Sequence, residues 1–417
     1  MSKDLTTLKS LTQEILGEDR LAELLNQIAN GEKVYHYIGY EVSGRPHIGH
    51  GILGMMVIKE LQKLGIHCRI FIADWHAWIN GKLGGDWELI QNTGVGLFKE
   101  YMIAGAKCVG VQLDGDNPLE FITGSELYSG EYYKNNPDKI PNNLNASLTR
   151  EDVLVTESQN RKVAQDKVLS PLTYWETLIK VSKNTTLARI QRSIDIMGRT
   201  EGEVVNFASL IYPPLQAADI FFMDNKIVHG GMDQRKIHVI AIDVGNELGF
   251  KPVAIHHALI LGLQAPSTET LQKVKKGEEI SATEIKMSKS KASTAIFMDE
   301  NEEEIRSKLR NAYCPEGDDT LNPILDWCDK IIFKLDNPKS KLNKKLEIKR
   351  KLEWGGDLTY TDFATLKEDF LAKKLHPVDL KIAVADYFVE LLQPAQEILN
   401  KPGVLNMKEE IKAKTGR

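Results

Sequence analysis

The chain has 417 residues, of which 42% are hydrophobic and 27% are charged, and its formal net charge is −5. This composition is typical of a globular protein with two or three domains, and no apolar run is long enough to span a membrane. The net charge neither indicates nor excludes a nucleic acid partner, because a local basic patch matters more than the total. The amino-terminus carries no signal-like apolar core, and the four cysteines form no CxxC pair. We therefore expect a cytoplasmic protein with reduced thiols.

Residues 5–30 carry a helical pattern that ends at Gly31, which predicts an N-terminal helical segment over residues 1–30. The next stretch, residues 35–51, organises the chain. It predicts a buried strand over 35–40, a turn over 43–46 and a helix from Ile48 to Leu64. This order is typical of the first βα unit of a doubly wound nucleotide-binding fold, in which ligands bind at the carboxyl end of the strand.

The sequence His-Ile-Gly-His places His47 and His50 at the start of that predicted helix. Backbone N–H groups and the helix dipole favour anions there, and Gly49 lets a phosphate or a base approach the backbone. Two imidazoles could then donate to phosphate oxygens as charge builds in a transition state. A metal site and a solvated pair are the alternatives, although no Cys or His partner stands at the usual metal-ligand spacing.

Further apolar runs alternate with helical patterns, which predicts an α/β domain with a parallel sheet. We expect strands over residues 68–74, 107–113, 226–229 and 252–255, and helices over 87–104 and 174–197. A turn-rich stretch over 132–170 interrupts this rhythm, so we expect an insertion over about residues 124–200. A polar stretch over 265–284 predicts an extra loop.

Residues 210–220 are apolar apart from three side chains on one predicted helical face. Tyr212, Gln216 and Asp219 follow one another at spacings of four and three, and we expect the helix to begin after Pro213 and Pro214. A capped surface helix is the alternative, but polar groups in an apolar segment need partners, which favours a pocket.

Two more segments bear on phosphate chemistry. Asp233 follows a predicted strand and a glycine turn, so it could cap a helix or accept a hydrogen bond from a ribose hydroxyl. Residues 286–290 read Lys-Met-Ser-Lys-Ser, a loop suited to holding a triphosphate and releasing pyrophosphate. A solvated basic loop is the alternative.

From residue 302 onward the pattern is mainly helical, with a basic run over residues 339–351. Trp354 follows this run. An exposed tryptophan beside basic groups could stack on an RNA base, and a tryptophan buried in the domain core is the alternative.

The His-Ile-Gly-His and Lys-Met-Ser-Lys-Ser sequences together resemble the two signatures of class I aminoacyl-tRNA synthetases. Residues 37–41, 212–219 and 230–238 resemble tyrosyl-tRNA synthetases of the archaeal and eukaryotic-cytosolic type, and the likeness extends from about residue 8 to about 393. The resemblance implies a Rossmann-type catalytic domain over residues 31–297 and a helical anticodon-binding domain over 298–417. It also implies activation of L-tyrosine by ATP with Mg²⁺, transfer to tRNA(Tyr), and a homodimer.

The resemblance also implies roles for single residues, without a metal ligand set or a tightly bound cofactor. The implied tyrosine-binding residues are Tyr37, Gly39, Glu41, Ala73, Tyr212, Gln216, Asp219 and Gln234. The implied ATP-binding residues are Gly49, Gly231, Asp233 and Lys289, and the implied catalytic residues are His47, His50, Lys286 and Lys289. The implied anticodon-reading residues are Trp354, His376 and Asp379.

Two other hypotheses belong to different classes. One is a small nucleotidyltransferase that uses a His-x-x-His phosphate site, and the lysine loop and the large helical tail argue against it. The other is a non-catalytic RNA-binding relative, and the intact His47, His50, Lys286 and Lys289 argue against decay. Exchange between pyrophosphate and ATP that depends on tyrosine would separate all three.

Overall fold

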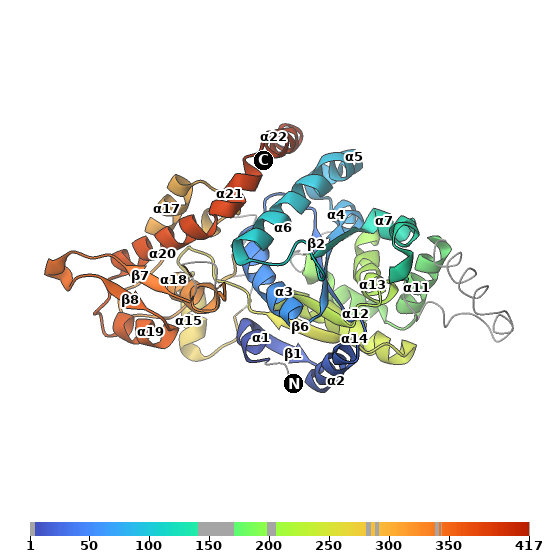
Figure 1. Ribbon diagram of the computed structural model, residues 1–417, viewed down its shortest axis with the longest axis horizontal. Helices are drawn as coiled ribbons and strands as arrows, with labels where there is room; N and C mark the ends of the chain where they lie inside the picture. The colour runs from blue at the N-terminus through green and yellow to red at the C-terminus, as the bar shows by residue number, and fades with distance from the viewer. Residues whose placement is uncertain are drawn as a thin grey trace.

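The structure is a computed structural model that describes residues 5–140, 171–197, 206–280, 285–287, 292–337, 342 and 344–416. Figure 1 shows a central sheet with helices packed on both of its faces, and a further, mainly helical region at one end of the molecule. The predicted α/β architecture with a mainly parallel sheet is therefore confirmed.

The sheet has six strands in the order β1-β6-β5-β2-β3-β4, and every pair is parallel except β1 with β6. The strand bounds are β1 Thr12–Leu16, β2 Tyr35–Glu41, β3 His67–Ala73, β4 Glu120–Thr123, β5 Ile227–Gly231 and β6 Val253–His257. Strand β2 lies between β5 and β3, so the carboxyl ends of these three strands meet at one edge of the sheet. In an open parallel sheet this edge is where ligands bind.

The helices of the sheet region are α1 Thr6–Leu11, α2 Glu18–Ala29, α3 Gly54–Lys63, α4 Asp74–Ile79, α5 Trp87–Leu89, α6 Val95–Val109, α7 Gly124–Tyr128, α8 Glu131–Asn135, α11 Pro171–Lys183, α12 Leu187–Arg192, α13 Phe207–Phe222, α14 Arg235–Leu248 and α15 Thr268–Lys276. Neighbouring side chains of β2 alternate between two cores, as strand geometry requires. Ile38 lies in a core shared with α3 and α6, whereas Tyr37 lies in a core shared with α11, α13 and α14.

Two predictions about the sheet were wrong. Residues 107–109 continue helix α6, which ends at Gly110 in the left-handed region, and the strand of this part of the chain is β4. The N-terminal segment is not helical throughout, because β1 divides it and pairs with β6. The partners of β1 lie more than two hundred residues away, so its local sequence does not reveal the pairing.

The remaining elements are α17 Glu302–Arg310, α18 Pro323–Trp327, β7 Leu346–Ile348, β8 Leu358–Tyr360, α19 Phe363–Leu371, α20 Pro377–Leu391, α21 Gln393–Leu399 and α22 Pro402–Thr415. This region is mainly helical, as predicted, but it also contains the two-stranded β7–β8 pair. Helices α21 and α22 return to pack against α6, and one hydrophobic core extends from the sheet into α20 and α21. The division of the chain at residues 297–298 remains a prediction.

Candidate active site

The predicted polar face of the 210–220 segment is buried and does not lie on the surface, and we call the buried region around these side chains the pocket. Tyr212, Gln216 and Asp219 are all buried on α13. The helix begins earlier than predicted, at Phe207, with the Asn206 side chain accepting a hydrogen bond from the Ser209 N–H, and Pro213 and Pro214 lie inside it. An internal proline removes a helical hydrogen bond, and the burial of all residues from Tyr212 to Phe222 offsets that loss.

Asp219 has one satisfied oxygen and one unsatisfied oxygen. The Tyr174 hydroxyl donates to Oδ1 over 2.5 Å. Oδ2 accepts no hydrogen bond within the described part of the chain, and the nearest ring nitrogen, Nε2 of His76, lies 3.6 Å away. Burial raises the pKa of Asp219 well above its usual value, and burial lowers the pKa of His76 to about 3. Neutral His76 is therefore no counter-charge for Asp219.

Tyr37 completes this end of the pocket from strand β2. It is fully buried, and burial, reinforced by the negative charge of Asp219, raises the pKa of its hydroxyl well above the usual value. A Cβ at Gly39 would lie 2.3 Å from the Tyr37 hydroxyl oxygen, so Gly39 makes room for that side chain. Ala73 ends β3 and is buried with Tyr37 in the same core. The structure thus brings Tyr37, Gly39 and Asp219 together.

A second group of polar side chains extends from this pocket. The Gln216 amide donates to the Gln234 side-chain oxygen over 3.4 Å, and Gln234 donates to the backbone oxygen of Ile196. Glu41 accepts a hydrogen bond from Asn80 over 2.8 Å. Burial, with a smaller contribution from Glu41, raises the pKa of Tyr212 well above its usual value. Amide, phenol and carboxylate groups of this kind suit the amino and carboxylate end of an amino acid.

The two predicted histidines lie together at the carboxyl end of β2. Their ring centroids are 4.1 Å apart, and the backbone N–H of Gly49 donates to Nδ1 of His47 over 3.1 Å. A Cβ at Gly49 would lie 2.9 Å from the His47 ring, so glycine permits this close approach. The bond fixes the His47 ring with Nδ1 as the acceptor and Nε2 as the position for a proton.

Asp233 and Lys286, which are far apart in the sequence, form an ion pair with a distance of 2.9 Å. Asp233 does not cap a helix, because neither Met232–Gln234 nor α14 has a side-chain cap. A Cβ at Gly231 would lie 2.7 Å from Asp233, which explains the small residue there. The ion pair connects two segments for which the resemblance implied roles in ATP binding and catalysis. Lys289 lies outside the described residues.

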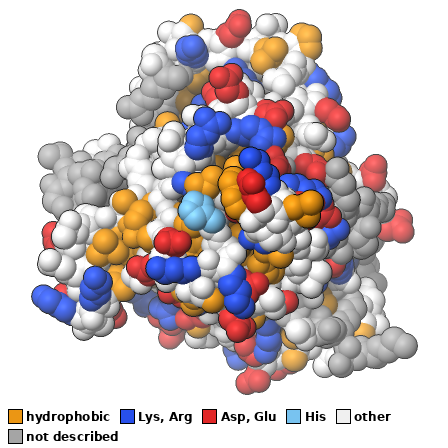
Figure 2. Space-filling view, turned by 90° about the vertical axis from the view of Figure 1, so that its left-hand side faces the viewer, with side chains coloured by type: hydrophobic (Ala, Val, Ile, Leu, Met, Phe, Trp, Pro, Cys, Tyr) orange, Lys and Arg blue, Asp and Glu red, His pale blue; other side chains and the backbone are white. Residues whose placement is uncertain are grey.

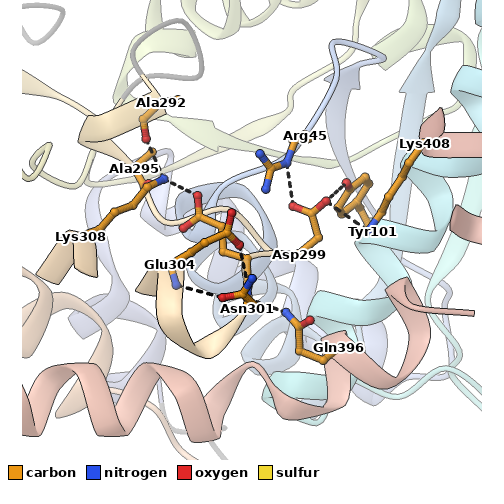
Figure 3. A network of polar contacts seen from close by, with 11 residues as sticks. Arg45, Tyr101, Ala292, Ala295, Asp299, Asn301, Glu304, Lys308, Gln396 and Lys408 are labelled. Atoms are coloured by element: carbon orange, nitrogen blue, oxygen red, sulfur yellow. Dashed lines mark hydrogen bonds and ion pairs between the residues drawn. The ribbon is translucent and has the colours of Figure 1, made fainter. Parts of the chain in front are cut away.

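The segment that follows the lysine loop holds the His47 turn in place. Ile48 N–H donates to Ile296 O, and Met298 N–H donates to Pro46 O, both over 3.0 Å. Next to these bonds, Asp299 accepts from Arg45 over 2.8 Å and from Tyr101 over 2.6 Å, and it pairs with Lys408 of α22 over 3.1 Å. Figure 3 shows these side chains converging on Asp299 from separate elements. No local sequence pattern predicts this contact.

Two further residues of the pocket were not predicted as site residues. Tyr174 lies in a helical pattern that nothing local distinguishes from a surface helix. His76 carried a weak signal, since it follows β3 at the sheet edge where ligands bind.

The predicted anticodon residues lie far from this pocket, in the C-terminal region. Trp354 lies between β7 and β8 and is 58% exposed, so the alternative of a core tryptophan is wrong; the buried tryptophan of this region is Trp327. His376 caps α20 by accepting from the Val378 N–H, and Asp379 lies in the first turn of that helix. Arg350 donates to Lys374 O, which brings the β7–β8 segment beside the start of α20. Figure 2 shows Lys and Arg side chains around exposed hydrophobic ones at this end of the molecule.

Comparison with known proteins agrees with the fold. Residues 29–393 match the family tRNA synthetases class I (W and Y), and the chain belongs to that family. It is 43% identical over 415 residues to a tyrosine–tRNA ligase of Thermococcus kodakarensis, covering 97% of this chain and 96% of that one. A crystal structure of tyrosyl-tRNA synthetase complexed with L-tyrosine from Pyrococcus horikoshii is 38% identical, with a TM-score of 0.75 and coverage of 98% of this chain and 100% of that chain. A tryptophanyl-tRNA synthetase of Aeropyrum pernix, 16% identical with a TM-score of 0.55, shares the fold.

None of the helices in the described part of the chain is long and apolar enough to cross a membrane. Among the described residues, no three His, Cys, Asp or Glu side chains are grouped so that they could hold a metal ion.

Proposed function

We propose that this protein is a tyrosine–tRNA ligase that activates L-tyrosine with ATP and then transfers it to the 3′ end of tRNA(Tyr). The observation that carries the choice of amino acid is the buried Asp219 oxygen that lacks a partner, in a pocket that also contains Tyr37. A phenol hydroxyl supplies the missing donor. Phenylalanine would fill the same space but leave that oxygen unpaired, which is costly in a buried site.

In the first step, the tyrosine carboxylate attacks the α-phosphate of ATP and pyrophosphate leaves. Mg²⁺ arrives with ATP and offsets part of the triphosphate charge. His47 and His50 lie beside each other where the phosphates would pass, and Lys286 and Lys289 belong to the loop that would hold the leaving pyrophosphate. Asp233 is placed to accept a ribose hydroxyl. Lys286 pairs with Asp233 in this structure, and in the proposed reaction it would leave Asp233 to reach a phosphate.

Tyr212, Gln216 and Gln234 are the groups that would hold the amino and carboxylate end of the substrate. The contact between Gln216 and Gln234 joins α13 to the segment after β5, so both side chains reach the same end of the pocket. Glu41, Gly39 and Ala73 line the approach from β2 and β3. In this arrangement the phenol binds deepest and the carboxylate points toward His47 and His50.

Transfer requires recognition of a particular tRNA, and the exposed Trp354 is the best candidate for contact with an anticodon base. A flat exposed ring with basic neighbours is suited to base stacking, and Lys351 lies 5.1 Å from the ring centre. Asp379 and His376 would accept or donate hydrogen bonds at the base edge. The three residues belong to two adjoining segments of one surface.

Replacing Trp354 by Ala should therefore weaken charging of tRNA(Tyr) and leave tyrosine activation intact. Loss of one stacked base corresponds to about 1–3 kcal/mol, which should raise the KM for tRNA by roughly fivefold or more. Leu352→Ala is a matched control, because Leu352 is 91% exposed in the same turn but cannot stack on a base. An equal rise of the KM for tRNA in Leu352→Ala would contradict the role of Trp354. An equal loss of tyrosine activation and of tRNA charging in Trp354→Ala would also contradict it.

We also expect a homodimer in the cytoplasm. Trp175, Ile179, Leu187 and Phe207 are each more than half exposed on or beside α11, α12 and α13, and an exposed apolar set of this size indicates an interface. The four cysteines are free, as a reducing compartment requires. Sedimentation at micromolar concentration tests the dimer, and a monomer would contradict it.

The activity itself is tested by tyrosine-dependent exchange of labelled pyrophosphate into ATP, followed by charging of tRNA(Tyr). We expect exchange with tyrosine and far less with tryptophan or phenylalanine at equal concentration. Exchange that needs no amino acid would favour a nucleotidyltransferase. Absence of exchange together with retained tRNA binding would favour a non-catalytic relative.

A further inference from the structure

Tyr174 makes a contact in the pocket that the proposed chemistry does not use. It belongs to α11, far in sequence from the elements that carry the substrate-binding side chains. Its hydroxyl is buried and donates to Oδ1 of Asp219 over 2.5 Å, with a longer approach of 3.4 Å to the Leu215 carbonyl. This hydroxyl is therefore the group that occupies one of the two Asp219 oxygens.

The position of the Tyr174 ring does not depend on Asp219. The ring lies 4.2 Å from the Tyr128 ring and packs edge-on against Phe222 at 5.2 Å, measured between ring centroids. The Tyr128 ring from α7 and the Phe222 ring from α13 thus hold the Tyr174 hydroxyl at a fixed point before any ligand enters. A hydroxyl whose ring is held in this way can orient a carboxylate, whereas a mobile hydroxyl would adjust to the position of the carboxylate.

The consequence for Asp219 is geometric. With Oδ1 occupied, the carboxylate presents only Oδ2 to the pocket, and Oδ2 has no partner within the described part of the chain. We infer that Tyr174 is a positioning residue that fixes the Asp219 carboxylate with one free oxygen facing the substrate phenol, and that it thereby sets the preference for tyrosine over phenylalanine. This inference rests on the proposed function.

The charge of Asp219 leads to the same conclusion. A carboxyl that is buried tends to remain protonated, and a protonated carboxyl could turn its O–H toward either ligand and discriminate less. Donation from Tyr174 stabilises the ionised form, which can only accept. The other groups that face Asp219 are Tyr128 from α7, whose hydroxyl also lowers the pKa of Asp219, His76 and Asp74 from α4, Tyr37 from β2 and Tyr212 from α13, and none of them is a cation.

The test compares two substitutions that each delete one buried hydroxyl next to the same helix. Tyr174→Phe removes the donor to Asp219. Tyr133→Phe is the control, because Tyr133 is also fully buried, contacts the same Phe222 ring and donates over 2.9 Å to the Phe222 backbone oxygen. Both variants keep their rings, and a thermal melt of each establishes that it is folded.

The measurement is pyrophosphate exchange with tyrosine and with phenylalanine across a range of pH. In Tyr174→Phe, the ratio of the two kcat/KM values should fall by about tenfold or more, the scale of a lost hydrogen bond to a charged group. The KM for ATP should not change. The acid limb of kcat/KM for tyrosine should move to higher pH, because the ionised carboxylate loses its donor. In Tyr133→Phe, the ratio and the pH profile should match those of the parent.

Three outcomes would overturn the inference. An unchanged ratio in Tyr174→Phe, with the parent preferring tyrosine, would remove Tyr174 from substrate selection and leave the proposed function standing. An equal fall in both variants would reduce Tyr174 to general support of α13. A parent protein without any preference for tyrosine would overturn the proposed function and this inference together.

Discussion

Two buried aspartates, Asp219 and Asp299, show how differently one side chain can be used in this molecule. Both are withdrawn from solvent, since Asp219 is 0% exposed and the Asp299 side chain is 7% exposed. Burial raises the pKa of Asp219 well above its usual value. Burial acts on Asp299 in the same direction, but Arg45, Lys408 and Tyr101 outweigh it, so that the pKa of Asp299 falls below its usual value.

The difference lies in the partners and not in the depth of burial. Asp299 has two cations and a hydroxyl, and it joins the His47 turn to α6 and α22 (Figure 3). Asp219 has the Tyr174 hydroxyl on Oδ1, whereas Oδ2 has no hydrogen-bond partner among the described residues. A buried charge that is fully paired in the free protein supports the architecture, whereas a buried acceptor without a partner indicates a position that a ligand completes.

The largest effect that this comparison predicts is on stability. Asp299→Ala should lower the free energy of unfolding by about 3 kcal/mol, because it leaves the buried Tyr101 hydroxyl without its acceptor and leaves Arg45 and Lys408 without their shared partner. Urea denaturation followed by circular dichroism measures the loss. Asp243→Ala is the control, since Asp243 pairs with Arg189 at the surface and its removal should cost less than about 1 kcal/mol. A loss for Asp299→Ala no larger than the control would show that Asp299 does not support the architecture.

The next effect is on substrate choice. Asp219→Ala should reduce the preference for tyrosine over phenylalanine by about 30-fold or more, corresponding to roughly 2 kcal/mol for a buried polar contact. Tyr37→Phe should reduce the preference less, because Asp219 can still accept the hydrogen bond from the substrate. The ratio of exchange efficiencies for the two amino acids measures both. A smaller effect from Asp219→Ala than from Tyr37→Phe would reverse the assigned importance of the two residues.

The smallest effect concerns the stability of the empty pocket. A carboxyl whose pKa is higher in the folded than in the unfolded state binds a proton on folding, so the free energy of unfolding falls as the pH rises from about 4 through the folded pKa. Asp219→Asn removes this penalty, and its melting temperature relative to the parent should rise between pH 5 and pH 8, with a gain of about 1 kcal/mol at pH 8. For Asp299 the sign is opposite. Its lowered pKa contributes stability above about pH 4 that is lost as the pH falls through the folded pKa, so Asp299→Asn should be destabilised at pH 8.

Parallel behaviour of the two asparagine variants at pH 8 would contradict the comparison. Scanning calorimetry without ligand is the appropriate measurement, because bound tyrosine would stabilise the parent by mass action and obscure the difference.

The sequence predicted the parts of this site that lie in short local patterns. His47 with Gly49 and His50, and Tyr212 with Gln216 and Asp219, are each set by one helix and a fixed spacing, so their proximity could be read from the chain. Both groupings are present in the structure. The ion pair between Asp233 and Lys286 was not predicted, although the resemblance implied roles in ATP chemistry for both residues.

The contacts that were missed join residues far apart in the chain. Arg45 and Asp299 are separated by 254 positions, and Tyr174 and Asp219 by 45, and no periodicity encodes either pair. Strand β1 was missed for the same reason, because its strand partner in the described part of the chain is β6. Strand β4 was missed because it is a run of four residues with mixed polarity. A local sequence pattern predicts which side chains share one face of a helix or strand. It does not predict contacts between side chains of different elements, because these depend on how the elements pack.

The most direct test measures exchange with tyrosine and with phenylalanine in Asp219→Leu and Asp299→Asn side by side. Leucine, unlike asparagine, leaves no oxygen that could accept a hydrogen bond from the substrate phenol. We expect Asp219→Leu to lose the preference for tyrosine while remaining folded, and we expect Asp299→Asn to keep the preference while losing stability. A preserved preference in Asp219→Leu, or a lost one in Asp299→Asn at a temperature where it is folded, would contradict the claim that the Asp219 carboxylate recognises the substrate phenol.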